Sequence, residues 1–338
     1  MKNASSINVF RDCLSVGVDV SKAELAIVGL TPDEHYLKRI GNQMKTIKAF
    51  LRQLQHSGYR GKIICESTGH YHLKLALVCH ELGLELIVLN PLQSSKHSKA
   101  RIRKTKTDPQ DALTLATMAL TEPKLPQPTQ LTRAKALIRL KMGQLASVEK
   151  QLQQFNQSRA QYEETYAELG LPLSPQQLAL REHSTSLKRL RKQLEKELEG
   201  LLAQALADDD RLAELRQIPG YSNVVAGLVA SLDRQVKRAD SWTAFVGLDV
   251  SVRQSGKWTG HGKLTKRGNA YMRKRLFQAA WGACLNYDYV RAYYDQLKAQ
   301  GRKHVEAVCM IARKLLRIAY HVVTNKIQFD PNIAFAEH

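Results

Sequence analysis

Two acidic residues in the first part of the chain stand where an acid is unusual. Asp19 interrupts the apolar run 14–20, and Glu66 ends the short apolar run 62–66. A carboxylate in such a run is destabilising unless it is paired or binds a cation. In α/β sheets, ligands gather at the carboxyl ends of the strands. Both acids are therefore candidate cation ligands. The structural alternative is that they only cap the turns that follow the two strands.

Two further acids, Asp108 and Asp111, lie in the segment 106–112. Asp108 precedes Pro109, which is typical of an N-cap before the first helical residue, and Asp111 follows three residues later on the same helix face. Acids in a first turn also complement the helix dipole, which explains the pair without any ligand. Together, however, the four acids form an all-oxygen donor set that suits Mg²⁺ or Mn²⁺. Such ions stabilise the attacking and leaving oxygens of a phosphate ester, so the sequence predicts a metal site here.

A serine in the C-terminal part of the chain lies in a loop rich in glycine and in cations. Ser255 begins a stretch without acids that extends to Arg275. Glycines and cations bring amides and positive charge close to phosphates. Ser255 is therefore either a hydrogen-bond donor to phosphate or, if its proton is removed and cations stabilise its attack, a nucleophile. The candidate phosphate-binding residues of this loop and the following helix are Arg253, Lys257, Lys263, Lys266, Arg267 and Arg273.

A second run without acids, residues 91–107, leads directly into the acid pair. Basic runs are commonly solvated surface, but the position of this one indicates that it holds a phosphate strand beside the acids. Trp258, inside the serine loop, is the tryptophan placed to stack on a base. The cations of the second run are Lys96, Lys99, Arg101, Arg103, Lys104 and Lys106.

The charge of the whole chain agrees with a polyanionic partner. With 51 Lys and Arg against 31 Asp and Glu in 338 residues, the formal charge is +20, which excludes an acidic disordered activator. A hydrophobic fraction of 43% is sufficient for packed cores. The resulting field attracts nucleic acid. The five cysteines are scattered and no apolar run is long enough for a membrane span, so we expect a soluble, cytoplasmic protein without a membrane partner.

Hydrophobic patterning divides the chain into three zones. Residues 13–121 alternate strand-like and helical segments, which predicts an α/β domain with a mixed sheet. A Pro-rich segment at 122–129 marks a boundary, and two leucine-rich helical repeats then flank a turn at 170–175. These repeats predict an antiparallel coiled-coil arm or, alternatively, a helical bundle folded onto the body. The last zone is mainly helical.

The expected elements and domains have the following bounds. Strands are expected at 14–20, 23–30, 35–41, 62–66 and 84–90, and helices at 44–56 and 71–82. Domains are expected at 1–121, 122–208 and 209–338.

Four short motifs of the first zone resemble, in the same order, those of the DEDD transposases of bacterial insertion sequences. The motifs are GVDVSK at 17–22, ESTG at 66–69, LNP at 89–91 and KTDPQDA at 106–112. This group includes the bridge-RNA-guided recombinases and the Piv-type DNA invertases, and its N-terminal domain is similar to the RuvC resolvase, with an RNase H-like fold. The resemblance implies that the metal-binding tetrad is Asp19, Glu66, Asp108 and Asp111.

The C-terminal zone is similar to the second domain of the same family, which carries a serine. The corresponding segments are Gly-Leu at 247–248, Ser-Gly at 255–256 and Arg-Gly-Asn at 267–269. The resemblance implies that Ser255 attacks DNA covalently while the acid tetrad of a partner subunit holds metal beside it, so that a dimer or tetramer is needed. The family usually has proline two residues after the Gly-Leu pair, where this chain has Asp249–Ser251, and Ser251 is therefore a second candidate.

These observations support three hypotheses of function. The leading one is a site-specific DNA recombinase of a mobile element, for which the resemblance also implies a structured noncoding guide RNA. The second is a metal-dependent nuclease or Holliday-junction resolvase in which water attacks. The third is a nucleic-acid-binding scaffold whose acids are only helix caps and turn formers. The turn at 218–222 is similar to a helix-hairpin-helix turn, so that Gly220 is expected to bring backbone amides to a DNA phosphate. The same residues also fit a plain turn between two helices.

Overall fold

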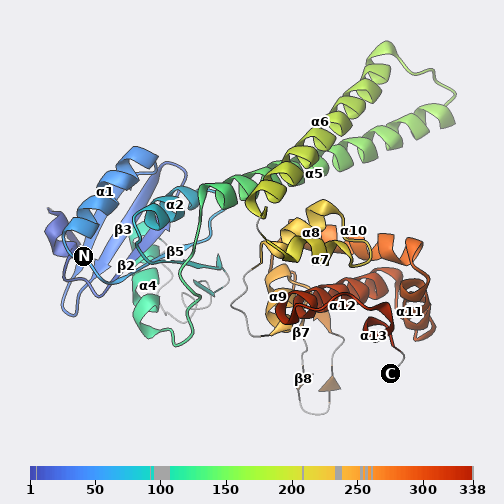
Figure 1. Ribbon diagram of the computed structural model, residues 1–338. Coiled ribbons are helices and arrows are strands. Elements are labelled where there is room, and N and C mark those ends of the chain that lie inside the picture. Colours follow the sequence, from blue (N-terminus) through green and yellow to red (C-terminus); the bar gives the residue numbers. More distant parts are fainter. Residues whose placement is uncertain are drawn as a thin grey trace. The chain divides into compact units, whose positions relative to one another are not determined.

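The computed structural model divides the chain into two units, residues 1–140 and 141–338, which are described separately below. Figure 1 labels their helices and strands. No helix in the described part of the chain is long and apolar enough to cross a membrane. The structure describes residues 1–4, 6–91, 93–94, 107–207, 209–232, 238–251, 254–255, 258–259 and 262–336.

The first unit is built on one six-stranded sheet with the strand order β1-β4-β3-β2-β5-β6. Strands β2, β3 and β4 form an antiparallel meander, whereas β5 runs parallel to β2 and β6 parallel to β5. The predicted α/β class with a mixed sheet is confirmed. Only β1 was not expected, since two residues are too few to form a pattern. The strands are β1 (Lys2–Asn3), β2 (Ser15–Val20), β3 (Glu24–Leu30), β4 (His35–Gly41), β5 (Lys62–Glu66) and β6 (Leu86–Leu89).

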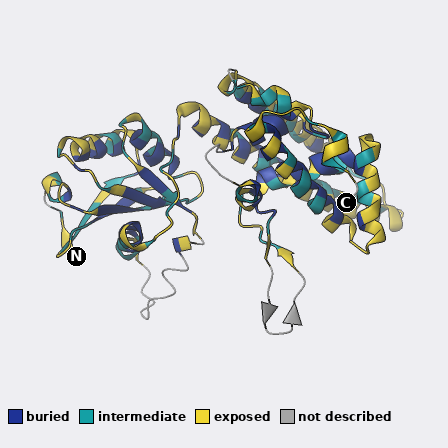
Figure 2. Cartoon of the chain, turned by 60° about the horizontal axis from the view of Figure 1, so that its bottom comes forward, coloured by how far each residue is buried: buried dark blue, intermediate teal, exposed yellow. Residues whose placement is uncertain are grey.

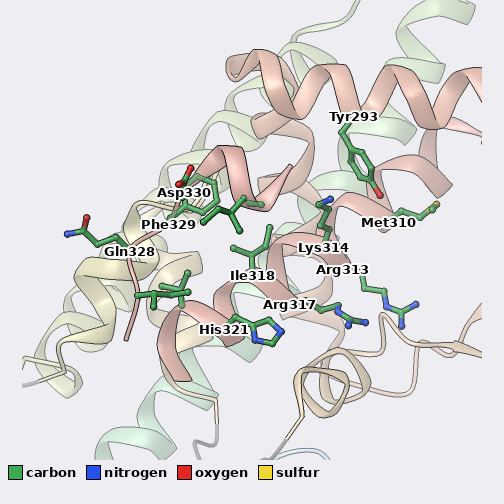
Figure 3. Close-up of a pocket in the computed structure, with 14 residues that line it drawn as sticks. Tyr293, Met310, Arg313, Lys314, Arg317, Ile318, His321, Gln328, Phe329 and Asp330 are labelled. Atoms are coloured by element: carbon green, nitrogen blue, oxygen red, sulfur yellow. The ribbon is translucent and has the colours of Figure 1, made fainter. Parts of the chain in front are cut away.

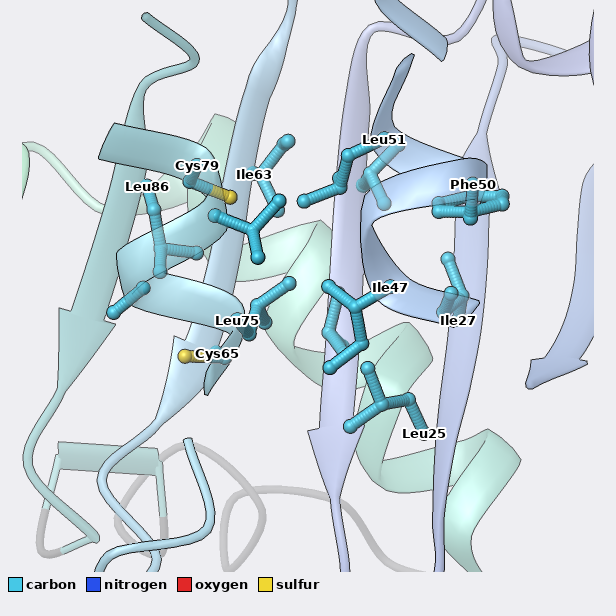
Figure 4. Packing of buried hydrophobic residues seen from close by; sticks show 14 of the residues in the cluster. Leu25, Ile27, Ile47, Phe50, Leu51, Ile63, Cys65, Leu75, Cys79 and Leu86 are labelled. Atoms are coloured by element: carbon cyan, nitrogen blue, oxygen red, sulfur yellow. The ribbon is translucent and has the colours of Figure 1, made fainter. Parts of the chain in front are cut away.

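Helices cover both faces of this sheet, whose strands are largely buried (Figure 2). On one face, α1 (Met44–His56) and α2 (Leu73–Glu81) pack their apolar sides on alternate strand residues, as Figure 4 shows for Leu51, Ile63 and Leu75. On the other face lies α4 (Asp108–Thr121). Its residues form a second, smaller core, in which Ile64, Ile87 and Leu89 of the sheet pack with Leu115, Met118 and Ala119.

Helix α4 lies unusually close to β2. Ser15 and Gly17 of β2 both face it, and the Ser15 hydroxyl donates a 2.7 Å hydrogen bond to the carbonyl of Ala116. A Cβ on Gly17 would lie 2.0 Å from the carbonyl oxygen of Ala112, which is nearer than any real contact. The absence of a side chain at Gly17 therefore allows helix and strand to meet backbone to backbone, and this contact fixes the position of α4 over the sheet.

The second unit is mainly helical, as expected. Its helices α10, α11 and α12 pack on one another, and α12 also packs on α7 and α9. Between α9 and α10 lie four short strands paired as β7–β10 and β8–β9. The elements are α6 (Pro175–Ala205), α7 (Arg211–Arg216), α8 (Asn223–Ala230), α9 (Ala239–Val246), β7 (Val250–Ser251), β8 (Gln254–Ser255), β9 (Trp258–Thr259), β10 (Lys263–Leu264), α10 (Ala270–Asn286), α11 (Asp288–Ala299), α12 (His304–Asn325) and α13 (Pro331–Ala334), preceded by α5 (Arg133–Glu168), which begins in the first unit.

Helices α5 and α6 form an antiparallel hairpin (Figure 1). Polar contacts set its register, because the buried Ser184 hydroxyl donates to the Asn156 side chain at 2.6 Å and Arg181 pairs with Glu163 at 2.9 Å. The helix α6 begins with a capping box on Ser174. An antiparallel pair was one of the two arrangements expected, whereas coiled-coil packing and the boundaries of the three domains stay predictions.

The contact between α4 and β2 gives a prediction for the stability of the fold. Gly17→Ala places a methyl group against backbone atoms, so we expect a loss of about 3 kcal/mol in the free energy of unfolding, at the upper end for an overpacked site. Urea unfolding followed by circular dichroism measures this loss. Gly41→Ala is the matched control, because a Cβ there meets nothing within 4 Å, and it should change stability by about 0.5 kcal/mol or less. Equal stabilities of the two variants would contradict this account of the contact.

Candidate active site

Register and alternation bring the two strand acids together at one edge of the sheet. The parallel pairing of β2 with β5 aligns Val18 with Cys65, so that the next residues, Asp19 and Glu66, are neighbours at the carboxyl ends of the two strands. Side chains alternate along a strand, and the residues two positions earlier on both strands face α4. Both acids therefore lie on the face of the sheet that α4 covers.

The two helix acids are placed by the rows of side chains that pack α4 on the sheet. Asp108 lies four residues before Ala112, which contacts β2, and Asp111 lies four residues before Leu115, which packs on β5 and β6. Residues four apart share a helix face, so both acids continue these rows toward the strand ends. The N-cap is Thr107 and not Asp108 as expected, which makes Asp108 the first helical residue. The helix thus begins one residue earlier than predicted.

The electrostatics of Asp19 agree with the placement of the four acids near one edge of the sheet. Burial, followed by the charges of Asp108, Asp111 and Glu66 in that order, raises the pKa of Asp19 from its ordinary value of 3.8 to about 6. The backbone amide of Val20, which hydrogen-bonds the carboxylate, acts in the opposite direction. Ionising Asp19 is therefore opposed both by the low dielectric and by three like charges.

Such a set of acids fits a divalent cation in donor type and in charge. All the donors are carboxylate oxygens, which hard cations prefer, and a cation would relieve the mutual repulsion that, after burial, raises the pKa of Asp19. Within the described ranges, no three or more His, Cys, Asp or Glu residues lie close enough together to hold a metal ion. The acids thus meet at one edge of the sheet at a spacing wider than that of direct ligands.

Two buried polar residues beside the acids were not found from the sequence. The first is Ser94, 6% exposed, whose hydroxyl lies 2.6 Å from Glu66 Oε2 and 3.0 Å from the carbonyl of Pro91. It follows the turn after β6, the neighbour of β5, and this adjacency is the signal that points to it. Ser94 supports the orientation of the Glu66 carboxylate.

The second is Asn42, which is 2% exposed. Its side-chain nitrogen donates to the carbonyl of Ser21 at 2.7 Å and to that of Tyr71 at 3.4 Å, and its backbone carbonyl accepts from Lys74 at 2.7 Å. Ser21 directly follows β2 and Tyr71 lies between β5 and α2. Asn42 therefore holds together the two connections that leave the strand ends bearing Asp19 and Glu66.

The predicted serine lies on a β-ribbon in the second unit. Ser255 belongs to β8 and pairs with Trp258 of β9, although the side chains of both residues lie outside the described part. At the base of the ribbon, Gly247 ends α9 with φ of 76°, and a Cβ on Gly268 would lie 1.9 Å from the Phe245 carbonyl. These two glycines let the incoming and outgoing chains cross at contact distance, which anchors the ribbon to the helices.

The second serine candidate has a defined partner. The hydroxyl of Ser251 in β7 donates to the carbonyl of Lys263 in β10 at 3.0 Å, across the pair of strands. This hydrogen bond gives Ser251 an ordinary structural role in the ribbon.

The predicted phosphate-binding cations are only partly covered by the structure. Lys263, Lys266 and Arg267 are exposed near the base of the ribbon. Arg273 is half-buried and donates to the carbonyl of Val246 at 2.8 Å, so it also clamps the end of α9. The remaining predicted cations, Lys96, Lys99, Arg101, Arg103, Lys104, Lys106, Arg253 and Lys257, lie outside the described residues.

Gly220, expected in a helix-hairpin-helix turn, has a clear packing role. Its φ is 77°, and a Cβ at this position would lie 2.1 Å from the carbonyl of Ala279 in α10. The turn between α7 and α8 therefore packs on α10 through its glycine. Phosphate binding by the amides of this turn stays a prediction.

An α/β unit with an acidic edge, followed by a helical unit, agrees with the comparisons with known proteins. Residues 16–167 match a family model for DEDD transposases of the IS110 type, described as "Transposase", which defines the class of protein. Residues 212–295 match a second model, described as "Transposase IS116/IS110/IS902 family". The two matches span most of the chain, which belongs to the IS110 family of transposases.

One curated relative shares a short stretch of sequence with this chain. It is the "Insertion element IS110 uncharacterized 43.6 kDa protein" of Streptomyces coelicolor, which is 32% identical over 79 residues. The match covers 23% of this chain and 19% of the relative, so it spans about a fifth of that protein.

The raised pKa of Asp19 gives a prediction for the pH dependence of stability. Between about pH 4 and pH 6 the folded state binds more protons than the unfolded state, so the free energy of unfolding must fall as the pH rises through this window. Asp19→Asn removes the group whose ionisation causes this fall in the free energy of unfolding. In a buffer with EDTA, we expect the variant to unfold at a higher temperature than the wild type above the window and at a similar temperature below it.

Asp12→Asn is the control for this comparison. Asp12 is exposed and its pKa is lowered by the hydrogen bond from Arg11, so its replacement should not stabilise the protein at neutral pH. If Asp19→Asn gives no stabilisation above pH 6, the four carboxylates do not repel one another as described.

Proposed function

We propose that the protein is a site-specific recombinase that cuts and rejoins the DNA of an insertion sequence, with Ser255 as the nucleophile and the four acids as a Mg²⁺ or Mn²⁺ site. The observation that carries the proposal is the register of β2 and β5, which makes Asp19 and Glu66 neighbours at the strand ends, on the face of the sheet that α4 covers. Membership of the IS110 family supports the same reaction. An RNase H-like, RuvC-like identity of the first unit is part of this proposal.

The acids would serve as a rigid holder for the cation. Asp19 and Glu66 project from strand ends, while Asp108 and Asp111 project from the first turn of α4, which covers the same face of the sheet. Ser94 and Asn42 keep the strand ends in place. A divalent cation bound by these acids supplies positive charge to the phosphoryl oxygens during strand cleavage.

The serine would divide the reaction into two transfers. In the first, Ser255 Oγ forms a bond to phosphorus, the bond from phosphorus to a sugar oxygen breaks, and the serine proton passes to that leaving oxygen. In the second, the hydroxyl of another DNA end attacks the serine phosphate ester and releases Ser255. One phosphoester bond is exchanged for another in each step, so no nucleotide cofactor is required.

The partners in this proposal are donor DNA, target DNA and a structured noncoding guide RNA. The net charge of +20 supports a polyanion of either kind, and the likeness to the bridge-RNA-guided members supports the RNA. A dimer or tetramer follows if the acids of one subunit act on the serine of another. This arrangement is supported by the division of the chain, since the acids belong to residues 1–140 and the serine to residues 141–338.

A second candidate function is a metal-dependent nuclease or junction resolvase in which water attacks the phosphate. One observation favours it, namely that all four acids converge within the first unit without any contribution from Ser255. The two functions differ in what they require of the serine.

Replacement of the serine separates these two functions. In a strand-exchange assay with purified protein, its RNA, DNA and Mg²⁺, we expect Ser255→Ala to lower the rate by about 10³-fold or more, because the nucleophile is lost. We also expect that the covalent protein–DNA species seen after denaturation of the wild type disappears. The products are resolved on denaturing gels.

Ser251→Ala is the matched control, and it should exchange strands at a rate within a few-fold of the wild type. If Ser255→Ala still cleaves DNA at the wild-type rate while Asp111→Ala does not, water is the nucleophile and the recombinase mechanism is wrong.

Binding of the cation gives a separate prediction that does not depend on DNA. At a Mg²⁺ concentration about 100 times the dissociation constant, the folded protein gains about 2.7 kcal/mol, so the melting temperature of the wild type should rise by several degrees and return with EDTA. Glu66→Gln should remove this rise.

The control for the metal experiment is Glu34→Gln, because Glu34 lies on the same unit but pairs with Lys2 and Tyr36 far from the acids in the sheet. This variant should keep the full response to Mg²⁺. An equal response of the wild type and Glu66→Gln would mean that the acids are not the metal site.

A further inference from the structure

A pocket of about 520 Å³ lies within the second unit, apart from the serine ribbon. Residues of α12 line one side of it, and the segment Ile327–Ala334, which folds back on α12, lines the other. Tyr293 of α11 also lines the pocket (Figure 3). Its volume falls within the range of about 300–1,000 Å³ for sites that hold small ligands. The pocket is therefore large enough for a ligand with a ring system. No residue that lines it takes part in the proposed reaction.

The α12 side of the pocket carries a row of cations. Arg313, Arg317 and His321 lie four residues apart and so share one helix face. One carboxylate, that of Asp240, lies 3.1 Å from Arg317 and 3.8 Å from Arg313, and it offsets only one of the two guanidinium charges. The Nε atom of Arg313 is buried and makes no hydrogen bond in the described structure. The row thus keeps a net positive charge and an unused donor.

Lys314 adds a cation that is held by rings and not by an acid. Its ammonium lies 4.3 Å from the centre of the Tyr293 ring and 5.0 Å from that of Phe335. Burial lowers the pKa of Lys314, and no carboxylate among the described residues forms an ion pair with it. A partly desolvated cation in such a position interacts strongly with an anion that enters the pocket.

The remaining walls are apolar or aromatic. Met310, Ile318, Val322 and Phe329 line the pocket, and Figure 3 shows Ile318 at its centre. The acid at the rim, Asp330, accepts a hydrogen bond from the amide of Asn332, two residues further along the chain, so its charge is partly satisfied there. The pocket therefore combines apolar walls for a flat group with several cations for a small anion.

We propose that this pocket binds one unpaired nucleotide of a nucleic-acid strand, with the base against the apolar wall and Tyr293, and the phosphate on Arg313, Lys314 and Arg317. A nucleotide is the unit that joins a flat aromatic face to a phosphate, and stacking of bases on aromatic side chains is tolerant of sequence. An acidic peptide would satisfy the cations, but it would leave the aromatic face without a matching group. The proposal rests on the proposed function only in requiring that the protein handles DNA or RNA strands.

The test is photochemical cross-linking of the full-length protein to a short single strand with one 5-iodouracil, in a DNA version and an RNA version. We expect cross-linked peptides that contain Tyr293 or Phe329 from at least one version, and the version that reacts identifies the strand. A duplex in which the iodouracil is base-paired should give no cross-link at these residues. Peptide mass spectrometry measures the yield.

Two variants test the pocket in different ways. Lys314→Gln removes a charge but keeps a side chain that packs on the rings, and Ala334→Trp fills the pocket without a change of charge. We expect each to lower the yield by about fivefold or more, as the loss of one stacking or phosphate contact would. Lys303→Gln is the control, because it removes the same charge from an exposed site just before α12 and should leave the yield unchanged.

The melting temperatures of all three variants are measured alongside, so that a lower yield from a folded variant reports on binding. Cross-links that map only to other residues, or equal losses in Lys314→Gln and Lys303→Gln, would overturn the proposal. Strand exchange by the wild type is followed in parallel. If exchange proceeds without a cross-link in the pocket, the recombinase function stands and the nucleotide site is wrong.

Discussion

The close contact between α4 and β2 is the constraint on which the candidate active site depends. A helix normally lies on a sheet through its side chains, but here Gly17 has none and the Ala112 carbonyl occupies the space that a Cβ would take. The hydrogen bond from Ser15 to the Ala116 carbonyl holds the next turn of the helix in the same way. Because α4 is rigid, this contact also determines where its first turn lies, and therefore where Asp108 and Asp111 meet the strand acids.

The assembled acids are unfavourable for folding. Burial is the larger cause of the raised pKa of Asp19, and the repulsion among four carboxylates at one sheet edge adds to it. The surrounding structure must therefore supply enough stability to hold them. This stability comes from the two cores on either face of the sheet and from the buried amide of Asn42. Sites that are strained by like charges in this way are common where an enzyme must bind a cation or tune a proton.

The sequence predicted most of this fold because its signals are local. Short apolar and β-branched runs predicted the strands of the sheet, and acids inside or at the end of these runs drew attention to Asp19 and Glu66. The supporting residues were missed because their partners are distant in the chain: Ser94 contacts an acid 28 residues earlier, and Asn42 contacts Tyr71, 29 residues later. A polar residue in a connecting segment gives no sign of such a contact until the order of the strands is known. The register of the α5–α6 hairpin could not be predicted for the same reason, since it depends on the contact between Ser184 and Asn156.

The distribution of charge also explains why an acidic cluster is compatible with a polyanionic substrate. A phosphate that approaches four carboxylates is repelled, so the acids can act on nucleic acid only with a cation between them and the phosphate. The opposite arrangement holds in the second unit, where the Lys and Arg side chains of the ribbon base and of α12 attract phosphates without help. In the proposed mechanism, fixed protein cations of one unit would hold the nucleic-acid strands, and the acids of the other would take part in the reaction. Under this proposal, the chain should bind nucleic acid whether or not the divalent ion is present, and only the chemical step should depend on that ion.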